Sequence, residues 1–90
     1  GNFASVKSTQ VRGEVDLRGM MGDETIATLE TYLDRAMLTG YNEVYIIHGK
    51  GKKIKRKRVQ EFLKASKYIK EYKDANQNEG GIGCTVATLK

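Results

Sequence analysis

The sequence predicts a single two-layer α/β domain in which two helices pack on a short sheet, in the order β-α-β-α-β-β. Two runs with helical apolar spacing alternate with short strand-like runs, a pattern typical of helices covering a sheet. A length of 90 residues leaves room for one modest core and for no second domain. Hydrophobic residues make up 39% of the chain and charged residues 30%, a balance typical of a folded globular domain.

The start of the chain predicts a tether and then a strand. Residues 1–10 show no sustained hydrophobic period, so we expect a flexible tether there and the folded domain at residues 11–90. Residues 11–17 place apolar side chains at alternate positions, which predicts a strand. We expect the side chains of Met20 and Met21 to pack beneath the turn that follows.

A helix and a second strand follow. Residues 22–39 repeat apolar side chains at helical spacing, with acidic residues at the start and Gly40 placed to end the helix. The expected inward face consists of Ile26, Leu29, Leu33, Ala36 and Met37, with Tyr32 and Leu38 beside it. The β-branched and aromatic run at residues 43–47 predicts a buried strand. This strand delivers His48 at its carboxyl end.

The second half of the chain predicts one more helix and two more strands. We expect a helix over residues 52–66. Its expected inward face consists of Ile54, Val59, Phe62 and Leu63. Residues 68–72 alternate like a strand, and residues 74–83 have the glycines and polar residues of a loop. The apolar run at residues 84–89 predicts the last strand.

The predicted topology brings two short segments together at one edge of the sheet. A crossover helix returns the chain to its starting edge, so the strands before and after it run parallel and their carboxyl ends meet. Residues 16–19 should therefore lie near residues 48–51. Ligands of open α/β sheets usually bind at such an edge. The candidate site residues are Asp16, Arg18, His48 and Lys50.

Each of these residues also has an explanation that involves no ligand. Asp16 can cap the turn into the next helix, and capping carboxylates outnumber catalytic acids. Arg18 can pair with a surface Glu, and His48 can be a hydrogen-bonded residue at the end of its strand. The expected convergence of all three at one edge favours a functional site.

A basic run adds an independent argument. The net charge is +5, and seven of the nine residues from Lys50 to Arg58 are Lys or Arg, whereas the rest of the chain has 9 basic and 11 acidic residues. Cations at the start of a helix oppose its dipole and repel one another. Bound phosphates relieve both effects, and the glycines on either side of Lys50 let backbone N–H groups gather round an anion. The run predicts phosphate contact rather than a passive charged face, a nuclear-localisation signal or a membrane anchor.

With these residues in place, the chain resembles the Smr (small MutS-related) domain family over about residues 12–90. ValAspLeuArgGly at 15–19 matches a family motif written LDLRG, and HisGlyLysGly at 48–51 matches HGxG. Residues 79–90 match a glycine-rich loop and closing strand. The resemblance implies a four-stranded mixed sheet and a two-layer fold similar to the C-terminal domain of a bacterial translation initiation factor.

The resemblance also implies nucleic-acid binding and, in several members, nicking endonuclease activity on DNA or RNA. It implies a parent protein with an ATPase core, as in a bacterial MutS paralogue, with roles in limiting recombination or rescuing collided ribosomes. The matched motif residues are Asp16, Arg18, His48, Gly49, Lys50 and Gly51. The family often continues HGxG with ThrGly, whereas this chain has Lys52 and Lys53, so charge replaces a helix-capping hydroxyl. This departure favours binding over hydrolysis.

Two hypotheses follow. In the first, the domain nicks DNA or RNA: Asp16 or His48 acts as general base or acid, and cations stabilise the charge that develops on the phosphate. The expected catalytic residues are Asp16, Arg18 and His48. In the second, the domain is a non-catalytic module that binds branched DNA, RNA or a ribosome for its parent. The expected nucleic-acid-binding residues are Arg18, Gly49, Lys50, Gly51, Lys52, Lys53, Lys55 and Arg56.

The sequence gives little support to a resident metal ion. Asp16 can hold Mg²⁺ or Mn²⁺ for cleavage only together with substrate oxygens, because one carboxylate is a poor metal site. No cluster of Asp and Glu supports a two-metal mechanism.

The remaining features predict a cytoplasmic piece of a longer protein. No apolar run approaches the roughly 20 residues that cross a bilayer, and no leader opens the chain. The single cysteine, Cys84, cannot form a disulfide within the chain, and we expect it to be a small buried hydrophobe. The chain starts at Gly1 without an initiating Met, so we expect either a longer parent polypeptide or a scar left by processing.

Overall fold

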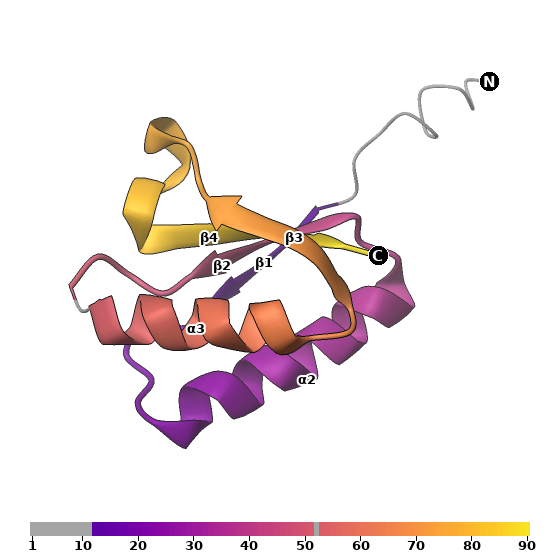
Figure 1. Ribbon diagram of the computed structural model, residues 1–90, viewed down its shortest axis with the longest axis horizontal. Helices are drawn as coiled ribbons and strands as arrows, with labels where there is room; N and C mark the ends of the chain where they lie inside the picture. Colours follow the sequence, from indigo (N-terminus) through magenta and orange to yellow (C-terminus); the bar gives the residue numbers. More distant parts are fainter. Residues whose placement is uncertain (1–11, 52) are drawn as a thin grey trace.

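Two helices cover one face of a four-stranded mixed sheet in the computed structural model, which describes residues 12–51 and 53–90 (Figure 1). The elements are β1 (Arg12–Asp16), α2 (Asp23–Thr39), β2 (Glu43–Ile47), α3 (Lys53–Ala65), β3 (Ile69–Asp74), two short 3₁₀ helices (Gln77–Glu79 and Gly81–Gly83) and β4 (Cys84–Leu89). The expected order β-α-β-α-β-β and the two layers are confirmed. The tether expected at residues 1–10, together with Val11 and Lys52, lies outside the described residues.

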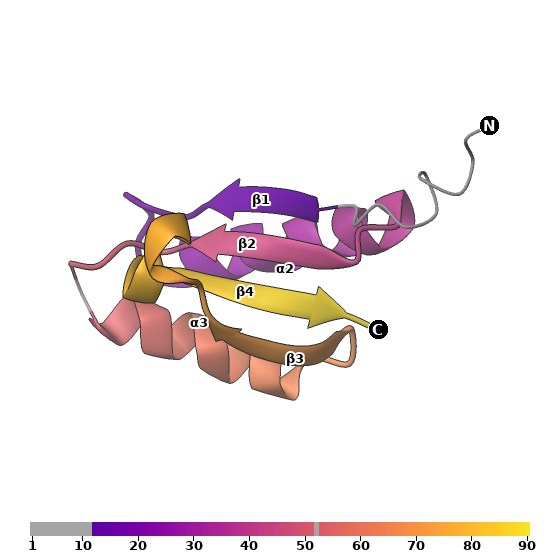
Figure 2. The same cartoon turned by 90° about the horizontal axis from the view of Figure 1, so that it is seen from above.

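The strands lie in the order β1-β2-β4-β3, as seen from above in Figure 2. β1 and β2 run parallel, whereas β4 is antiparallel to both of its neighbours, β2 and β3. The register pairs Asp16 with Ile47, the last residues of β1 and β2. The segments that follow these strands therefore leave the sheet at the same edge, as the crossover argument predicts.

The main core lies between the sheet and the two helices. Its buried members are Leu17, Leu29, Leu33, Ala36, Val44, Ile46, Val59, Leu63, Ile69, Ala87 and Leu89. Because successive strand residues point to opposite faces, Tyr45 and Ile47 face away from the helices. There they pack with a smaller cluster of Ala75, Cys84 and Val86, and Cys84 is buried as expected. Neither described helix has the length and apolar content that a membrane span needs.

Two apolar side chains that the sequence placed inward or beside the inward face are exposed. Ile54 is 71% exposed and Leu38 is 89% exposed. Each lies five residues from a buried residue of its own helix, Val59 or Leu33, and five residues rotate a helix by about 1.4 turns. Four residues before Val59, on the inward side of α3, is the partly buried Lys55.

Two other expectations also need correction. Met21 is 75% exposed, so only Met20 of the pair packs against the core beneath the turn. The strand expected at residues 68–72 runs from Ile69 to Asp74, because pairing with β4 continues to Thr85. The expected loop at residues 74–83 contains both 3₁₀ helices.

Candidate functional site

The loop after β2 is held in place by the glycine-rich segment before β4. The carbonyl oxygen of Gly83 accepts hydrogen bonds from the backbone N–H groups of His48 (3.1 Å) and Gly49 (2.9 Å). A Cβ atom on Gly83 would lie 2.8 Å from Cγ of Lys50 and 3.4 Å from its backbone nitrogen. Gly49 has a φ of 90°, a left-handed conformation that glycine adopts readily. Glycine at both positions therefore lets the two loops meet.

Asp16 and Arg18 form an exposed ion pair at this edge. The guanidinium donates from Nε to Oδ1 (2.9 Å) and from Nη2 to Oδ2 (2.7 Å), and the backbone N–H of Arg18 also donates to Oδ1 (3.0 Å). These bonds from Arg18 lower the pKa of Asp16 to about 2. The stem of Arg18 lies beside the other loop, since a Cβ atom on Gly49 would be 3.4 Å from its Cγ. The expected convergence thus brings together Arg18, Gly49 and, through Gly83, Lys50.

His48 lies on the other side of the sheet from this ion pair. Asp16 and its register partner Ile47 face away from the helices, so His48, the next residue, turns toward them. Its side chain reaches Thr85 on β4, with 2.8 Å between Nε2 and Oγ1. The structure does not bring the two expected acid–base groups, Asp16 and His48, together.

The hydrogen bonds of His48 indicate the tautomer of its neutral ring. Nδ1 lies 3.2 Å from the carbonyl oxygen of Gly49, which can only accept, so Nδ1 carries the proton. Nε2 accepts from the Thr85 hydroxyl, which in turn accepts from Nε2 of Gln60 at 3.1 Å. Burial lowers the pKa of His48, in agreement with a neutral ring. His48, Thr85 and Gln60 together support the loop at residues 48–51 from the side of the helices.

This support continues onto the surface through α3. Gln60 also donates to Oδ1 of Asp74 (3.3 Å), and Arg56 donates from Nη2 to both oxygens of the same carboxylate at 2.9 Å. Sequence reasoning missed Thr85, Gln60 and Asp74. A hydroxyl inside the apolar run of the last strand could have signalled Thr85, but nothing in the sequence marks the other two residues.

The expected nucleic-acid-binding cations divide into engaged and unpaired groups. Lys55 donates from Nζ to the carbonyl oxygen of Leu17 (3.1 Å), and Arg18 and Arg56 are ion-paired with carboxylates. Of the expected set, Lys50 and Lys53 are exposed and have no hydrogen-bond or ion-pair partner among residues 12–51 and 53–90. The same holds for Lys57 and Arg58, which belong to the same basic run but not to the expected binding set.

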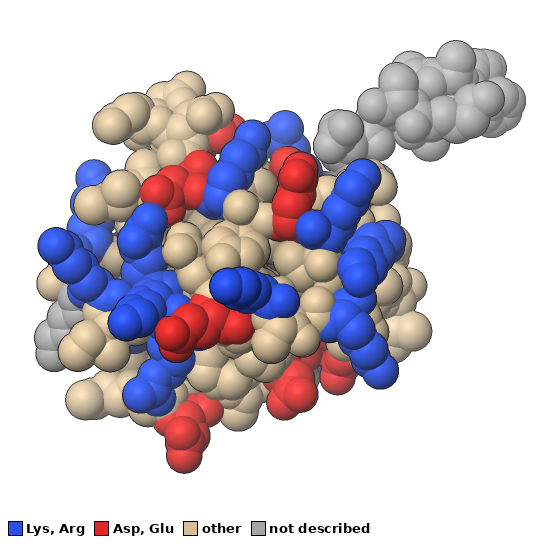
Figure 3. Space-filling model, in the orientation of Figure 1, with Lys and Arg blue, Asp and Glu red and all other residues tan. Residues whose placement is uncertain are grey.

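Basic side chains gather at the left of the view in Figure 3, over the end of the molecule where α3 begins. A second group lies over the right-hand end, and acidic side chains lie among fewer basic ones between the two. Lys52 belongs to the expected binding set but lies outside the described residues.

The donor set at this edge does not fit a resident metal ion. Within the described parts of the chain, no three His, Cys, Asp or Glu side chains cluster closely enough to hold one. Both carboxylate oxygens of Asp16 are already bonded to Arg18. Mg²⁺ and Mn²⁺ prefer several oxygen ligands, so the side chains present here would not hold them without further oxygens.

Comparison with known proteins gives consistent matches. The family model described as the Smr domain matches residues 15–90. The protein named endonuclease MutS2 from Fusobacterium nucleatum is 57% identical over 99% of this chain and 11% of its own length. Its namesake from Staphylococcus carnosus is 49% identical over 89% of this chain and 10% of its own length. This chain therefore spans about a tenth of the length of these relatives.

Two solved structures share the fold. The crystal structure of the Smr domain of Thermus thermophilus MutS2 matches with a TM-score of 0.84 and 35% identity, covering 87% of this chain and 98% of that one. The structure of YdaL, a stand-alone small MutS-related protein from Escherichia coli, matches with a TM-score of 0.81 and 25% identity. It covers 86% of this chain and 63% of that one.

Proposed function

Since the chain belongs to the Smr domain family, we propose that it binds nucleic acid and nicks DNA or RNA as part of a larger MutS2-like protein. One observation carries the proposal. The exposed Asp16–Arg18 ion pair lies against the glycine loop at residues 48–51, and this loop leads into the cation-rich start of α3. A bound phosphodiester can therefore meet unpaired cations and a guanidinium–carboxylate pair at one edge of the sheet.

Binding is assigned to those cations of the basic run from Lys50 to Arg58 that have no hydrogen-bond or ion-pair partner among residues 12–51 and 53–90. Lys50, Lys53, Lys57 and Arg58 are free to neutralise phosphates, which drives association through the release of counterions. Lys55 and Arg56 also belong to the expected binding set, but each has a partner that it would have to leave or share. We therefore expect them to contribute mainly by fixing α3 against β1 and β3.

Cleavage is assigned to Asp16 and Arg18. Hydrolysis of a phosphodiester forms a bond between a water oxygen and phosphorus and breaks the bond from phosphorus to the leaving oxygen, which takes a proton from solvent and departs as an alcohol. Negative charge grows on the non-bridging oxygens in the transition state. A guanidinium binds phosphate with the same two-pronged geometry that it uses here for the carboxylate. Once the guanidinium of Arg18 turns to the phosphate, Asp16 loses the side-chain bonds that contribute most to its low pKa and keeps only the bond from the Arg18 backbone N–H. Asp16 then becomes a better acceptor for the proton of the attacking water.

His48 takes a positioning role in this proposal. Both ring nitrogens are bonded within the protein, and the side chain is buried on the helix-covered side of the sheet. Its bonds to Gly49 and Thr85 hold the loop that carries Lys50. Loss of His48 should therefore weaken binding and cleavage together.

We extend the proposal to the parent protein. The chain covers only 10–11% of the relatives named endonuclease MutS2, which leaves room in them for a MutS-like ATPase core in cis. Such a parent would deliver the domain to branched DNA, RNA or a ribosome in the cytoplasm.

A second candidate function is nucleic-acid binding without cleavage. Efficient proton transfer favours groups with a pKa near the working pH. In the free protein the pKa of Asp16 is about 2, and His48 is neutral, buried and fully bonded. These observations favour a binding module unless substrate binding changes the Asp16–Arg18 pair.

A nicking assay separates the two functions. Supercoiled plasmid and structured RNA are incubated with the 90-residue chain, with Mg²⁺ or Mn²⁺ and in EDTA, and strand breaks are counted on gels. We expect Asp16→Asn and Arg18→Gln to lower the nicking rate by roughly 10²-fold or more. Glu43→Gln is the matched control, because it breaks another carboxylate–guanidinium pair, with Arg12 (3.1 Å), and should leave nicking unchanged.

Each result has a definite meaning. Binding of both substrates without any break by the wild-type chain would leave only the binding module. Equal nicking by Asp16→Asn and the wild type would remove Asp16 from the cleavage site. Loss of nicking in Glu43→Gln as well would indicate a general effect of disturbing the sheet.

A further inference from the structure

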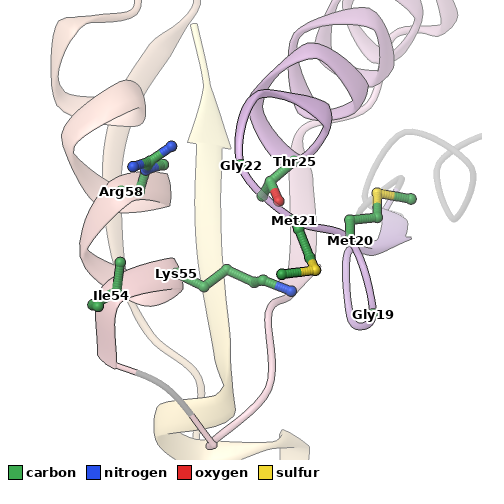
Figure 4. A pocket seen from close by; sticks show the side chains of 8 residues that line it. All are labelled: Gly19, Met20, Met21, Gly22, Thr25, Ile54, Lys55 and Arg58. Atoms are coloured by element: carbon green, nitrogen blue, oxygen red, sulfur yellow. The ribbon is translucent and has the colours of Figure 1, made fainter.

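A mostly apolar cavity of about 470 Å³ lies beside the proposed phosphate-binding edge (Figure 4). One wall comes from the turn between β1 and α2 and the first turn of α2, with Met20, Met21 and Thr25. The other wall comes from the start of α3, with Ile54, Lys55 and Arg58. Lys55 extends from α3 toward Met21 across the cavity. The volume is within the roughly 300–1,000 Å³ of small-molecule sites.

Apolar side chains are exposed at the rim of this cavity. Met21 is 75% exposed and Ile54 is 71% exposed, and they stand on opposite walls. Burying either side chain against a flat apolar ligand would be favourable, since apolar surface would leave water. The sulfur of a methionine also contacts aromatic rings favourably.

A buried hydroxyl without a partner lines the same cavity. Thr25 is 1% exposed, and its Oγ1 makes no hydrogen bond with any group of residues 12–51 and 53–90. A buried polar atom without a partner costs free energy, so a ligand that offers one is favoured there. The cavity therefore combines apolar walls with one unsatisfied polar atom.

The surrounding charge indicates what the ligand carries. Arg58 lines the cavity and belongs to the unpaired cations, and Lys53 precedes Ile54 in the same helix turn. A ligand whose apolar part fills the cavity would therefore hold anionic groups beside these two side chains. An apolar side chain of a partner protein offers neither an anion nor a polar edge for Thr25.

We propose that the cavity receives one unstacked base of the bound nucleic acid, an inference that rests on the proposed function. The base lies between Met21 and Ile54, its polar edge bonds to the Thr25 hydroxyl, and its flanking phosphates lie toward Arg58 and Lys53. Every base has an apolar face, so such a site favours unpaired over paired nucleic acid without strong sequence preference.

The test compares three oligonucleotide duplexes by fluorescence anisotropy. One duplex is fully paired, one has a single extrahelical adenine, and one has an abasic residue at the same bulge. We expect the wild-type chain to bind the extrahelical adenine roughly fivefold or more tightly than the other two, the lower end of what base stacking contributes. The abasic duplex separates recognition of the base from recognition of the bent backbone.

Substitutions in the cavity test whether the preference for the extrahelical adenine arises there. Met21→Ala with Ile54→Ala should bring the affinity ratio of adenine bulge to abasic bulge close to 1, with affinity for the paired duplex retained. Leu38→Ala is the control, because it removes an apolar side chain that is even more exposed (89%) at the other end of α2 and should leave the ratio unchanged. Thr25→Val keeps the shape and removes the hydroxyl, so it should lower the ratio while the melting temperature stays within a few degrees.

Two failures are distinguishable. A wild-type ratio of 1 with tight binding to all three duplexes, or a double variant that keeps the wild-type ratio, would overturn the base site and leave the proposed function standing. Absence of binding to every duplex by the wild-type chain would overturn both.

Discussion

The surroundings of two titratable side chains at this edge favour the deprotonated form of each, which is charged for Asp16 and neutral for His48. Asp16 is exposed and held ionised by Arg18, whereas His48 is buried, and burial lowers its pKa and favours the neutral ring. The first arrangement can open when a phosphate competes for Arg18. The side chain of His48 is buried, so its hydrogen bonds can break only if the loop at residues 48–51 moves.

The pKa of Asp16 should respond to its partner. In Arg18→Gln the carboxylate loses its largest stabilising bonds, so its pKa should rise from about 2 toward the ordinary 3.8. Lys55→Gln is the control, because Lys55 lowers the same pKa by a smaller, purely coulombic effect. Titration of the Asp16 carboxyl ¹³C chemical shift measures both. An unshifted pKa in Arg18→Gln would show that the ion pair does not form in solution.

His48 should make stability depend on pH. Burial lowers its pKa below 6.5, so between 6.5 and the folded-state pKa the unfolded chain binds a proton that the folded chain does not. The free energy of unfolding should therefore fall as the pH drops below about 6.5, by no more than about 1.4 kcal/mol per pH unit. Urea unfolding near pH 7.5 and near pH 5.5 measures it. In His48→Gln the free energy of unfolding should fall less between these two pH values. An equal fall in the variant and the wild type would assign the pH dependence to other titratable groups.

At the same scale, the sequence predicted which residues reach the edge but not the direction of each side chain. Crossover connectivity determines which strand ends meet, so Asp16, Arg18 and Lys50 could be placed from spacing alone. Whether Asp16 and His48 share a face depends on the exact register of β1 on β2, which spacing does not determine. The side-chain partner of His48, Thr85, lies 37 residues away on β4, and Gln60, which bonds Thr85, lies on α3, so nothing local encodes these contacts.

At the scale of elements, the site depends on how closely the segment before β4 approaches the loop after β2. Gly83→Ala would place a methyl group 2.8 Å from Cγ of Lys50 and force the two loops apart. We expect the free energy of unfolding to fall by about 1–3 kcal/mol, which is typical of overpacking. Gly51→Ala is the matched control, since a Cβ atom there meets nothing within 4 Å. Equal urea midpoints for the two variants would show that the segment before β4 and the loop after β2 have room for a methyl group between them.

The bounds of both helices were predicted to within a residue or two. The inward face of the first turn of α3 was predicted wrongly. Periodicity correctly identified Val59 and Leu63 as buried, but it counted Ile54 as an inward residue because it is apolar. The geometry of the helix gives the inward position to Lys55, whose stem is partly buried while Nζ bonds the end of β1. A charged residue with a long apolar stem can occupy such a position, and a hydrophobicity pattern does not register it.

At the scale of the whole molecule, some charged side chains are held in ion pairs or hydrogen bonds within the protein, and others are exposed and unpaired among the described residues. One sheet edge carries the ion-paired Asp16 and Arg18, the loop at residues 48–51 and the start of α3. A second basic group lies over the other end of the same face, around the end of α3 and the start of β3. Total charge therefore does not identify the binding surface. Its location can be tested by removing equal charge from each end.

The salt dependence of binding tests the central claim most directly. The affinity of the 90-residue chain for a short DNA duplex is measured over a range of salt concentrations. The variant Lys53→Gln/Lys57→Gln/Arg58→Gln should have a shallower logarithmic slope, by about 0.9 for each phosphate that is no longer neutralised and about 2.7 for all three. The matched variant Lys64→Gln/Lys67→Gln/Lys70→Gln should keep the wild-type slope. An unchanged slope in the first variant, or an equal change in both, would contradict a phosphate-binding surface at the start of α3.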